Sequence, residues 1–188
     1  MKKLSVIVPC YNEEETIPIF HKAINEISIS MQKQYECEFE ILFIDDGSND
    51  STSEIMKELS MKDSRIHFIS FSRNFGKEAA IFAGLENCSG DYVVTMDVDM
   101  QDPPSLLPQM YEIVSKEGYD CVATRRSSRK GEPIIRSMLA RWFYKIMNKI
   151  SDTEIIDGAR DYRFMTRQMV EAVLSLKEYN RFSKGINS

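Results

Sequence analysis

Residues 92–104 read Tyr92-Val93-Val94-Thr95-Met96-Asp97-Val98-Asp99-Met100-Gln101-Asp102-Pro103-Pro104. The apolar start predicts a buried strand, and two carboxylates follow it one residue apart. Because side chains alternate along a strand, Asp97 and Asp99 are expected on the same side. Converging carboxylates suit a hard divalent cation, Mg²⁺ or Mn²⁺. The motif by itself equally fits solvated acids on a surface loop.

The residues after this motif predict the start of a helix. Asp102 is a favourable N-cap residue, and Pro103 is favourable in a first helical turn. The carboxylate pair would then lie at the carboxyl end of a strand. Ligands bind at that edge in open α/β sheets.

Strand and helix patterns alternate along the whole chain. The sequence predicts an α/β fold with right-handed βαβ units and a mostly parallel, Rossmann-like sheet flanked by helices. Neither Gly-x-Gly-x-x-Gly nor a P-loop motif is present, which disfavours a dinucleotide site and a P-loop site. The expected strands are 4–9, 39–44, 66–71, 92–96 and 119–124, and the expected helices are 13–29, 51–61, 77–87 and 106–116.

Charge is distributed unevenly over the 188 residues. Residues 1–119 carry 10 basic and 21 acidic side chains, whereas residues 120–188 carry 14 and 8. An acidic half suited to a metal is thus followed by a basic half suited to an anion, although solvated surface charge would give the same pattern. The acidic total disfavours nucleic acid as a partner. The four cysteines form no Cys-x-x-Cys pair and are interpreted as reduced thiols.

Residues 134–150 predict a basic amphipathic helix. Apolar residues recur there at three- and four-residue spacing, while Arg136, Arg141, Lys145 and Lys149 occupy other faces. Such a helix packs on a sheet or lies at a membrane surface, and both alternatives stay open.

Polar residues follow each of the first four predicted strands. In a parallel sheet these strand ends share one rim, where they supply an aromatic ring, carboxylates, a cation and a candidate metal pair. Together they predict a pocket for a nucleoside diphosphate. The four segments are 9–13, 45–48, 73–77 and 97–101.

Several of these segments resemble family 2 glycosyltransferases of the GT-A fold. The matching stretches are Val6-Ile7-Val8-Pro9-Cys10-Tyr11-Asn12-Glu13-Glu14, Ile44-Asp45-Asp46-Gly47-Ser48, and Asp97-x-Asp99-x-Gln101-Asp102-Pro103-Pro104. Two further stretches, Arg73-Asn74-Phe75-Gly76-Lys77-Glu78-Ala79-Ala80 and Asp161-Tyr162-Arg163-Phe164-Met165, resemble the polyprenyl-phosphate branch. That branch includes dolichol-phosphate mannose synthase and undecaprenyl-phosphate glucosyltransferases.

The resemblance implies a role for each matching residue. The residues that it implies as binding the nucleotide-sugar are Pro9, Tyr11, Glu13, Ile44, Asp46, Arg73 and Asp97. It implies Asp99 and Gln101 as ligands of a divalent metal (Mg²⁺ or Mn²⁺), Asp99 and Asp161 as catalytic residues, and Arg125 and Arg136 as ligands of the acceptor phosphate. Alternatively, Arg73 is a plain surface cation, and Asp161 forms an ion pair with Arg160 or Arg163.

The implied activity is inverting transfer of a sugar from a UDP- or GDP-sugar to a polyprenyl phosphate. It would take place at the cytoplasmic inner face of a membrane. One alternative is a family 2 transferase acting on a sugar hydroxyl in polysaccharide or cell-envelope synthesis, and another is a non-catalytic nucleotide-sugar-binding fragment. Residues 1–188 are expected to form one GT-A catalytic domain of a longer protein, because family members usually continue beyond this point. The oligomeric state stays open.

Overall fold

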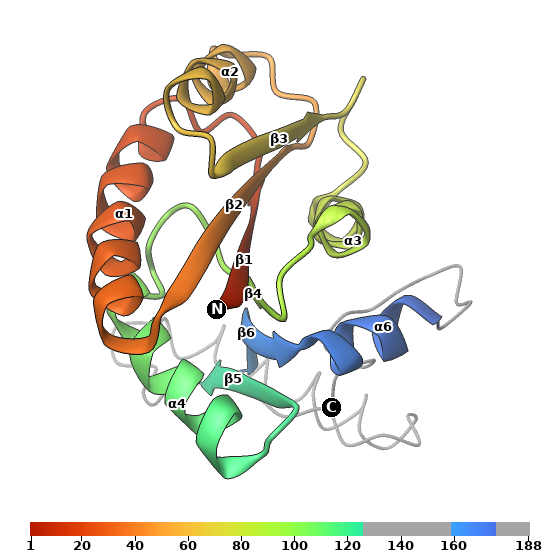
Figure 1. Ribbon diagram of the computed structural model, residues 1–188. Coiled ribbons are helices and arrows are strands. Elements are labelled where there is room, and N and C mark those ends of the chain that lie inside the picture. The colour runs from red at the N-terminus through yellow and green to blue at the C-terminus, as the bar shows by residue number, and fades with distance from the viewer. Residues whose placement is uncertain (126–158, 176–188) are drawn as a thin grey trace, which may run out of the picture.

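A computed structural model describes residues 1–125 and 159–175 (Figure 1). Within them, strands and helices alternate, and the strands form one sheet with the order β3-β2-β1-β4-β6-β5. The strands are β1 (Lys2–Cys10), β2 (Cys37–Asp45), β3 (Ile66–Ser70), β4 (Tyr92–Thr95), β5 (Cys121–Arg125) and β6 (Ala159–Thr166). The helices are α1 (Thr16–Tyr35), α2 (Thr52–Lys62), α3 (Lys77–Asn87), the 3₁₀ turn η1 (Pro104–Leu106), α4 (Leu107–Glu117) and α6 (Arg167–Ser175).

The predicted mostly parallel sheet is confirmed. β1 pairs in parallel with β2 and β4, and β2 pairs in parallel with β3. β6 lies between β4 and β5 and is antiparallel to both. Neither β6 nor α6 was among the predicted elements.

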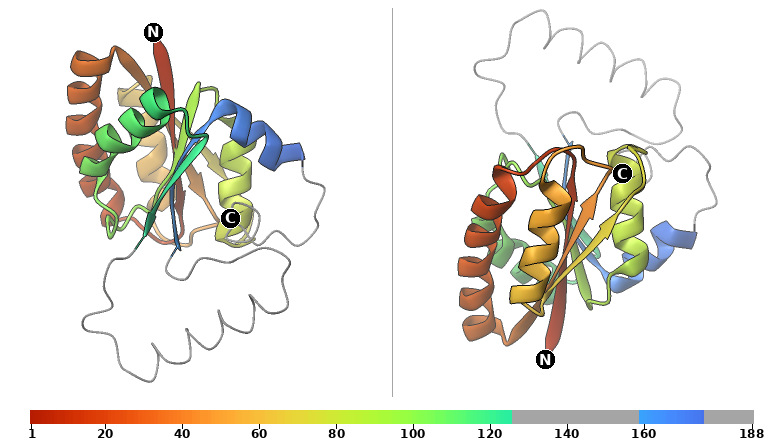
Figure 2. Two further views of the ribbon diagram at one scale, coloured as in Figure 1. Left: turned by 90° about the horizontal axis from the view of Figure 1, so that it is seen from below. Right: turned by 90° about the horizontal axis from the view of Figure 1, so that it is seen from above.

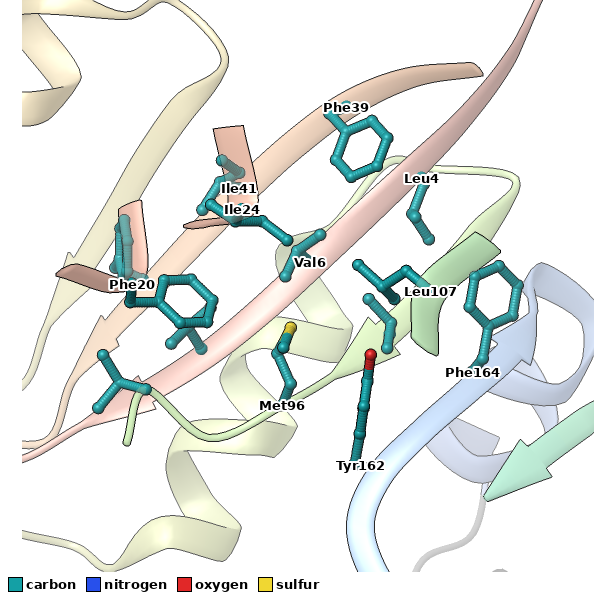
Figure 3. Packing of buried hydrophobic residues seen from close by; sticks show 14 of the residues in the cluster. Leu4, Val6, Phe20, Ile24, Phe39, Ile41, Met96, Leu107, Tyr162 and Phe164 are labelled. Atoms are coloured by element: carbon teal, nitrogen blue, oxygen red, sulfur yellow. The ribbon is translucent and has the colours of Figure 1, made fainter. Parts of the chain in front are cut away.

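Helices cover both faces of the sheet (Figures 1 and 2). α1, α2 and α4 lie on one face, and α3 and α6 lie on the other. Each face has its own apolar cluster. Phe20 and Ile24 of α1 point toward Val6 and Ile41 in the first cluster (Figure 3). β1 is therefore buried on both faces, which explains its continuous apolar sequence.

The helix α3 packs unusually close to the sheet. A side chain at Gly84 would overlap the side chain of Ile7, so only glycine fits this contact. The close approach fixes α3, and hence its first residue Lys77, relative to β1.

Glu40 fastens three segments at the amino ends of the strands. Its carboxylate accepts hydrogen bonds from the hydroxyl of Ser5 in β1, from the backbone N–H (2.9 Å) and hydroxyl (2.8 Å) of Ser89, and from Lys3 Nζ (3.0 Å). Burial by itself raises the pKa of Glu40, but the hydrogen bonds from Ser5 and Ser89 outweigh burial and lower this pKa to about 2. The ionised carboxylate thus ties β1 and β2 to the turn that precedes β4.

Several local predictions need correction. The first helix begins at Thr16 rather than at residue 13, because the preceding residues form a loop. The second helix begins at Thr52 rather than at residue 51, and the preceding Ser51 makes no capping hydrogen bond through its side chain. Asp102 is not an N-cap, because the helical turn begins two residues later, at Pro104.

No helix in residues 1–125 or 159–175 is both long and apolar enough to cross a membrane. The predicted amphipathic helix 134–150 lies outside the described residues.

Candidate functional site

A pocket of about 400 Å³ opens at the carboxyl ends of β1, β2 and β4. This is the edge at which open α/β sheets bind ligands, and the volume lies within the range of small-molecule sites. The lining side chains are mostly polar. They come from the loop after β1 (Pro9, Cys10, Tyr11 and Glu13), from Asp46 after β2, from residues before and at the start of α3 (Asn74, Gly76 and Lys77), and from Asp97, Val98 and Asp99 after β4.

The loops after β1 and β2 are fastened to each other by hydrogen bonds. The backbone N–H of Asn12 donates to Ser48 Oγ (2.9 Å), and the N–H of Asn49 donates to the side-chain oxygen of Asn12 (2.9 Å). The N–H of Glu13 donates to Thr52 Oγ1 (2.8 Å). Asn12 has a φ of 55°, a conformation that asparagine tolerates better than most residues. These polar residues therefore hold the pocket wall that carries Tyr11.

Asp46 holds the loop that leads into α3. It is buried, and its two carboxylate oxygens accept the backbone N–H groups of Phe75 (2.7 Å) and Gly76 (2.9 Å). The next residue, Gly47, has a φ of +72°, and a Cβ there would overlap the backbone of Arg73. The loops after β2 and β3 are thus packed backbone to backbone, which orders the approach to Lys77.

The two acids of the Asp-x-Asp motif have different surroundings. The strand β4 ends at Thr95, so the motif lies in a turn beyond it, and Met100 adopts a φ of 53°. Asp99 is exposed, and its Oδ1 accepts the backbone N–H of Gln101 (3.1 Å). Asp97 forms an ion pair instead. Strand alternation therefore does not apply to these two residues, although both line the pocket.

Lys77 joins Asp97 to Asp161. Its Nζ lies 2.7 Å from Asp97 Oδ1 and 2.8 Å from Asp161 Oδ2. Burial by itself lowers the pKa of Lys77, but hydrogen bonds to Asp161 and Asp97 outweigh burial and raise this pKa. The ammonium group therefore stays charged between two carboxylates.

The register of β6 determines where Asp161 lies. Tyr162 and Phe164 face the cluster under α1 and α4, so by alternation Asp161 faces the side of α3. The hydroxyl of Thr95 donates to the backbone carbonyl of Asp161, which continues the pairing of β4 with β6. Asp161 Oδ1 is buried and has no hydrogen-bond partner within the described parts of the chain. The ion pair that the structure gives Asp161 is with Lys77.

The structure brings most of the predicted donor residues together. Six of them line the pocket, namely Pro9, Tyr11, Glu13, Asp46, Asp97 and Asp99. Ile44 does not, because it is fully buried in the cluster under α3, and its place beside the nucleoside stays a prediction. Arg73 and Gln101 are exposed outside the lining residues, and the guanidinium of Arg73 lies over the Phe75 ring, 4.8 Å from its centroid.

The predicted acceptor site lies outside the described side chains. Arg125 is the last residue of β5, but its side chain is not described, and Arg136 lies outside the described residues. The roles predicted for both arginines therefore stay predictions.

Lys77 is the residue that sequence reasoning missed. The stretch 73–77 was noticed, but a role was assigned only to Arg73. The available signal was position, since Lys77 directly follows Gly76 and opens a helix at the same edge as Asp97.

The pocket is acidic. Glu13, Asp46, Asp97 and Asp99 line it together with a single lysine among the described lining residues. Within those residues, no three His, Cys, Asp or Glu side chains are grouped to hold a metal. Asp99 is free of ion pairs with described residues and has the hard oxygen ligands that Mg²⁺ and Mn²⁺ prefer. Its chemistry fits a divalent cation that takes its other ligands from substrate and water.

A mostly parallel sheet with a polar pocket at the carboxyl ends of its strands defines an open α/β protein with a pocket at the usual ligand-binding edge. Comparison with known sequences narrows this class. The chain belongs to glycosyl transferase family 2, whose sequence profile matches residues 5–174.

Curated relatives match nearly all of the chain. Bactoprenol glucosyl transferase of Shigella phage SfV is 44% identical over 186 residues, which covers 99% of this chain and 59% of that protein. A prophage bactoprenol glucosyl transferase homolog of Escherichia coli K12 matches with the same identity and coverage. The chain thus spans about three fifths of the length of these relatives.

Solved structures support the predicted GT-A fold. Residues 1–349 of Staphylococcus aureus TarS match with a TM-score of 0.63 at 18% identity, covering 98% of this chain and 53% of that one. A mannosyltransferase from Pyrobaculum calidifontis, in complex with GDP-Man and Mn²⁺, matches with a TM-score of 0.62 at 20% identity, covering 92% and 46%.

Proposed function

We propose that this chain is the donor-binding catalytic domain of an inverting glycosyltransferase that moves a hexose from a nucleotide-diphosphate sugar to a polyprenyl phosphate. The observation that carries the proposal is the pocket in which Lys77 joins Asp97 to Asp161 beside an exposed Asp99. The bactoprenol glucosyl transferases, 44% identical over almost the whole chain, support the acceptor class and favour glucose.

The donor would lie along the rim of the sheet. Tyr11 offers a half-exposed ring for the base, and Glu13 and Asp46 offer carboxylates beside it. Both oxygens of Asp46 already accept backbone N–H groups, so we assign Asp46 chiefly to holding this wall of the pocket. Asp97 would face the ribose or the sugar.

A divalent metal, Mg²⁺ or Mn²⁺, would be held by Asp99 and by oxygens of the donor diphosphate, with Gln101 as a further ligand. When bound, it offsets the negative charge that develops on the leaving diphosphate. The acidity of the pocket supports this assignment, because a diphosphate could not approach four carboxylates without added positive charge.

The reaction would be an in-line displacement. A phosphate oxygen of the acceptor attacks the anomeric carbon, the bond from that carbon to the diphosphate oxygen breaks, and the nucleoside diphosphate leaves with the electron pair. A phosphate monoester has its second pKa near ~6, so at pH 7 the acceptor is largely ionised and needs no base. Asp161 would then orient the sugar or stabilise its developing positive charge, and Arg125 and Arg136 would hold the acceptor phosphate.

A transferase that uses a sugar hydroxyl as acceptor is the second candidate. The buried Oδ1 of Asp161 favours it, because this oxygen has no hydrogen-bond partner among the described residues and a base needs an oxygen free to take a proton. Asp161→Asn distinguishes the two candidates: a hydroxyl acceptor loses all activity, whereas a phosphate acceptor retains a measurable rate.

The test uses radiolabelled UDP-glucose and GDP-mannose with a short polyprenyl phosphate in detergent, with Mn²⁺ or with EDTA. We expect metal-dependent transfer of label into the organic phase from one donor, abolished by Asp99→Ala. Binding of the same donor is measured separately by calorimetry. Donor binding without transfer or hydrolysis would instead identify a non-catalytic donor-binding fragment, and absence of binding would refute the proposed donor site.

A further inference from the structure

Lys77 connects three elements that carry the pocket. It is the first residue of α3, Asp97 lies in the loop after β4, and Asp161 lies in β6. Because one nitrogen lies within hydrogen-bonding distance of both carboxylates, Asp97 and Asp161 are less than about 6 Å apart, a distance at which like charges repel strongly. The lysine therefore determines whether the two carboxylates can stay in this arrangement.

The position of Lys77 is itself held firmly. Gly84 packs against Ile7 and fixes α3 on β1, and Asp46 accepts the backbone N–H groups of Phe75 and Gly76 just before Lys77. The ammonium group is half-buried and lies within hydrogen-bonding distance of both Asp97 oxygens, Oδ1 (2.7 Å) and Oδ2 (2.9 Å), and of Asp161 Oδ2 (2.8 Å). Because both its backbone and its ammonium group are held in place, Lys77 can fix the distance between Asp97 and Asp161.

We propose that Lys77 is a positioning residue for sugar transfer: by holding Asp97 and Asp161 on either side of the pocket, it sets the gap that receives the donor hexose. This inference rests on the proposed function. It gives a role to Lys77, which the proposed function does not use as a ligand of the metal or as a contact of the nucleoside.

The structure separates this role from nucleotide binding. The wall that carries Tyr11 is fastened through Asn12 to Ser48 and Asn49, and Glu13 is fastened to Thr52, by hydrogen bonds that do not involve Lys77. Loss of the lysine should therefore leave the nucleoside side intact and disturb only the part of the pocket that meets the sugar.

The first test compares UDP with UDP-glucose as ligands of the wild-type chain and of Lys77→Met, by calorimetry in Mn²⁺. We expect UDP affinity to change less than 3-fold. We expect UDP-glucose affinity and kcat to fall about 10- to 100-fold, the size expected for losing charge-assisted hydrogen bonds. Lys62→Met removes an exposed, ion-paired lysine of α2 and is the matched control, expected to change neither affinity.

A second test uses the geometry of the ion pairs. Lys77→Arg keeps the charge and should retain at least a third of the wild-type kcat, whereas Lys77→Met keeps only an apolar stem and should not. Asp161→Asn removes one of the two repelling charges. The fold loss of kcat that Lys77→Met causes should therefore be at least 5 times smaller in the Asp161→Asn background than in the wild type.

Three outcomes would overturn the inference while wild-type activity is intact. They are an unchanged kcat in Lys77→Met, an equal loss of affinity for UDP and for UDP-glucose, and fully additive effects in the Asp161→Asn background. If the wild-type chain itself binds UDP without transferring glucose, the proposed function fails, and the comparison of UDP with UDP-glucose binding still tests the role of Lys77.

Discussion

Replacing Glu40 by glutamine should destabilise the chain by about 3 kcal/mol. The pKa of Glu40 is lowered from its ordinary value of 4.5 to about 2, and a difference of this size corresponds to about 3 kcal/mol of preferential stabilisation of the ionised form. The side chain is 8% exposed, so solvent screens these bonds little. Glutamine has nearly the same shape, so the loss isolates charge and hydrogen bonding from packing.

The hydrogen-bond pattern explains why an amide cannot substitute. Each carboxylate oxygen of Glu40 accepts two hydrogen bonds, one oxygen from Lys3 and the Ser89 hydroxyl, the other from Ser5 and the Ser89 backbone N–H. Glutamine would have to turn its amide nitrogen toward one of these two pairs of donors. The amide nitrogen is itself a donor, so it could not accept their hydrogen bonds. The Ser5 hydroxyl also accepts the backbone N–H of Gly90 (2.8 Å), so it cannot simply reverse its bond.

The assay is urea unfolding followed by circular dichroism, with Glu38→Gln as the control because Glu38 is exposed on the same strand. Since the folded pKa is the lower one, the stabilisation is fully present above pH 4.5 and is lost as the pH falls toward 2. At pH 3.5 about 1.4 kcal/mol of it should already be lost in the wild type and not in Glu40→Gln. A variant within 1 kcal/mol of wild type at pH 7, or a wild-type advantage that stays constant from pH 6 to 3.5, would refute the reasoning.

Three further predictions concern the pocket. Gly47→Ala should destabilise the chain by at least about 1–3 kcal/mol in urea unfolding, because φ is +72° and the new methyl group would overlap the Arg73 backbone; a neutral result would contradict the close approach. Asp46→Asn should lower the free energy of unfolding by about 1.5–3 kcal/mol. It should also speed hydrogen exchange of the Gly76 amide, because it weakens the acceptor of that amide, and unchanged exchange would argue against this bond. Asp99→Ala should leave unfolding within about 0.5 kcal/mol of wild type, because the side chain is exposed, yet abolish the rise in melting temperature that UDP gives with Mn²⁺; a persistent rise would exclude Asp99 as a metal ligand.

Within residues 1–125, each strand and helix that local patterns predict is present, with small differences at the ends. Apolar runs marked β1 to β4, and the polar residues after them marked the rim, because these signals lie within a few residues of each other. The same local signals do not indicate whether Ile44 reaches the pocket. β2 is buried on both faces, so alternation gives no sign of which side chains reach the pocket.

The pairing of Lys77 with Asp161 could not be predicted from local pattern. The two residues are 84 positions apart, and only the insertion of β6 between β4 and β5 brings them together. Residues 159–166 combine charged residues with a buried Arg163, which hides the strand from a hydropathy pattern. Sheet order depends on long-range packing, and the Asp-x-Asp turn depends on the left-handed Met100, which no residue preference indicates.

The antiparallel strand β6 also makes the chain modular. Arg125 pairs with Ala159, so β5 ends and β6 begins at neighbouring positions of the sheet. The anchoring of β6 by β4 and β5 keeps Asp161 in place whatever connects the two ends. Doubling the length of such a connection costs only about 0.6 kcal/mol. The connection between β5 and β6 can therefore change in length at little cost while the pairing that holds Asp161 is kept.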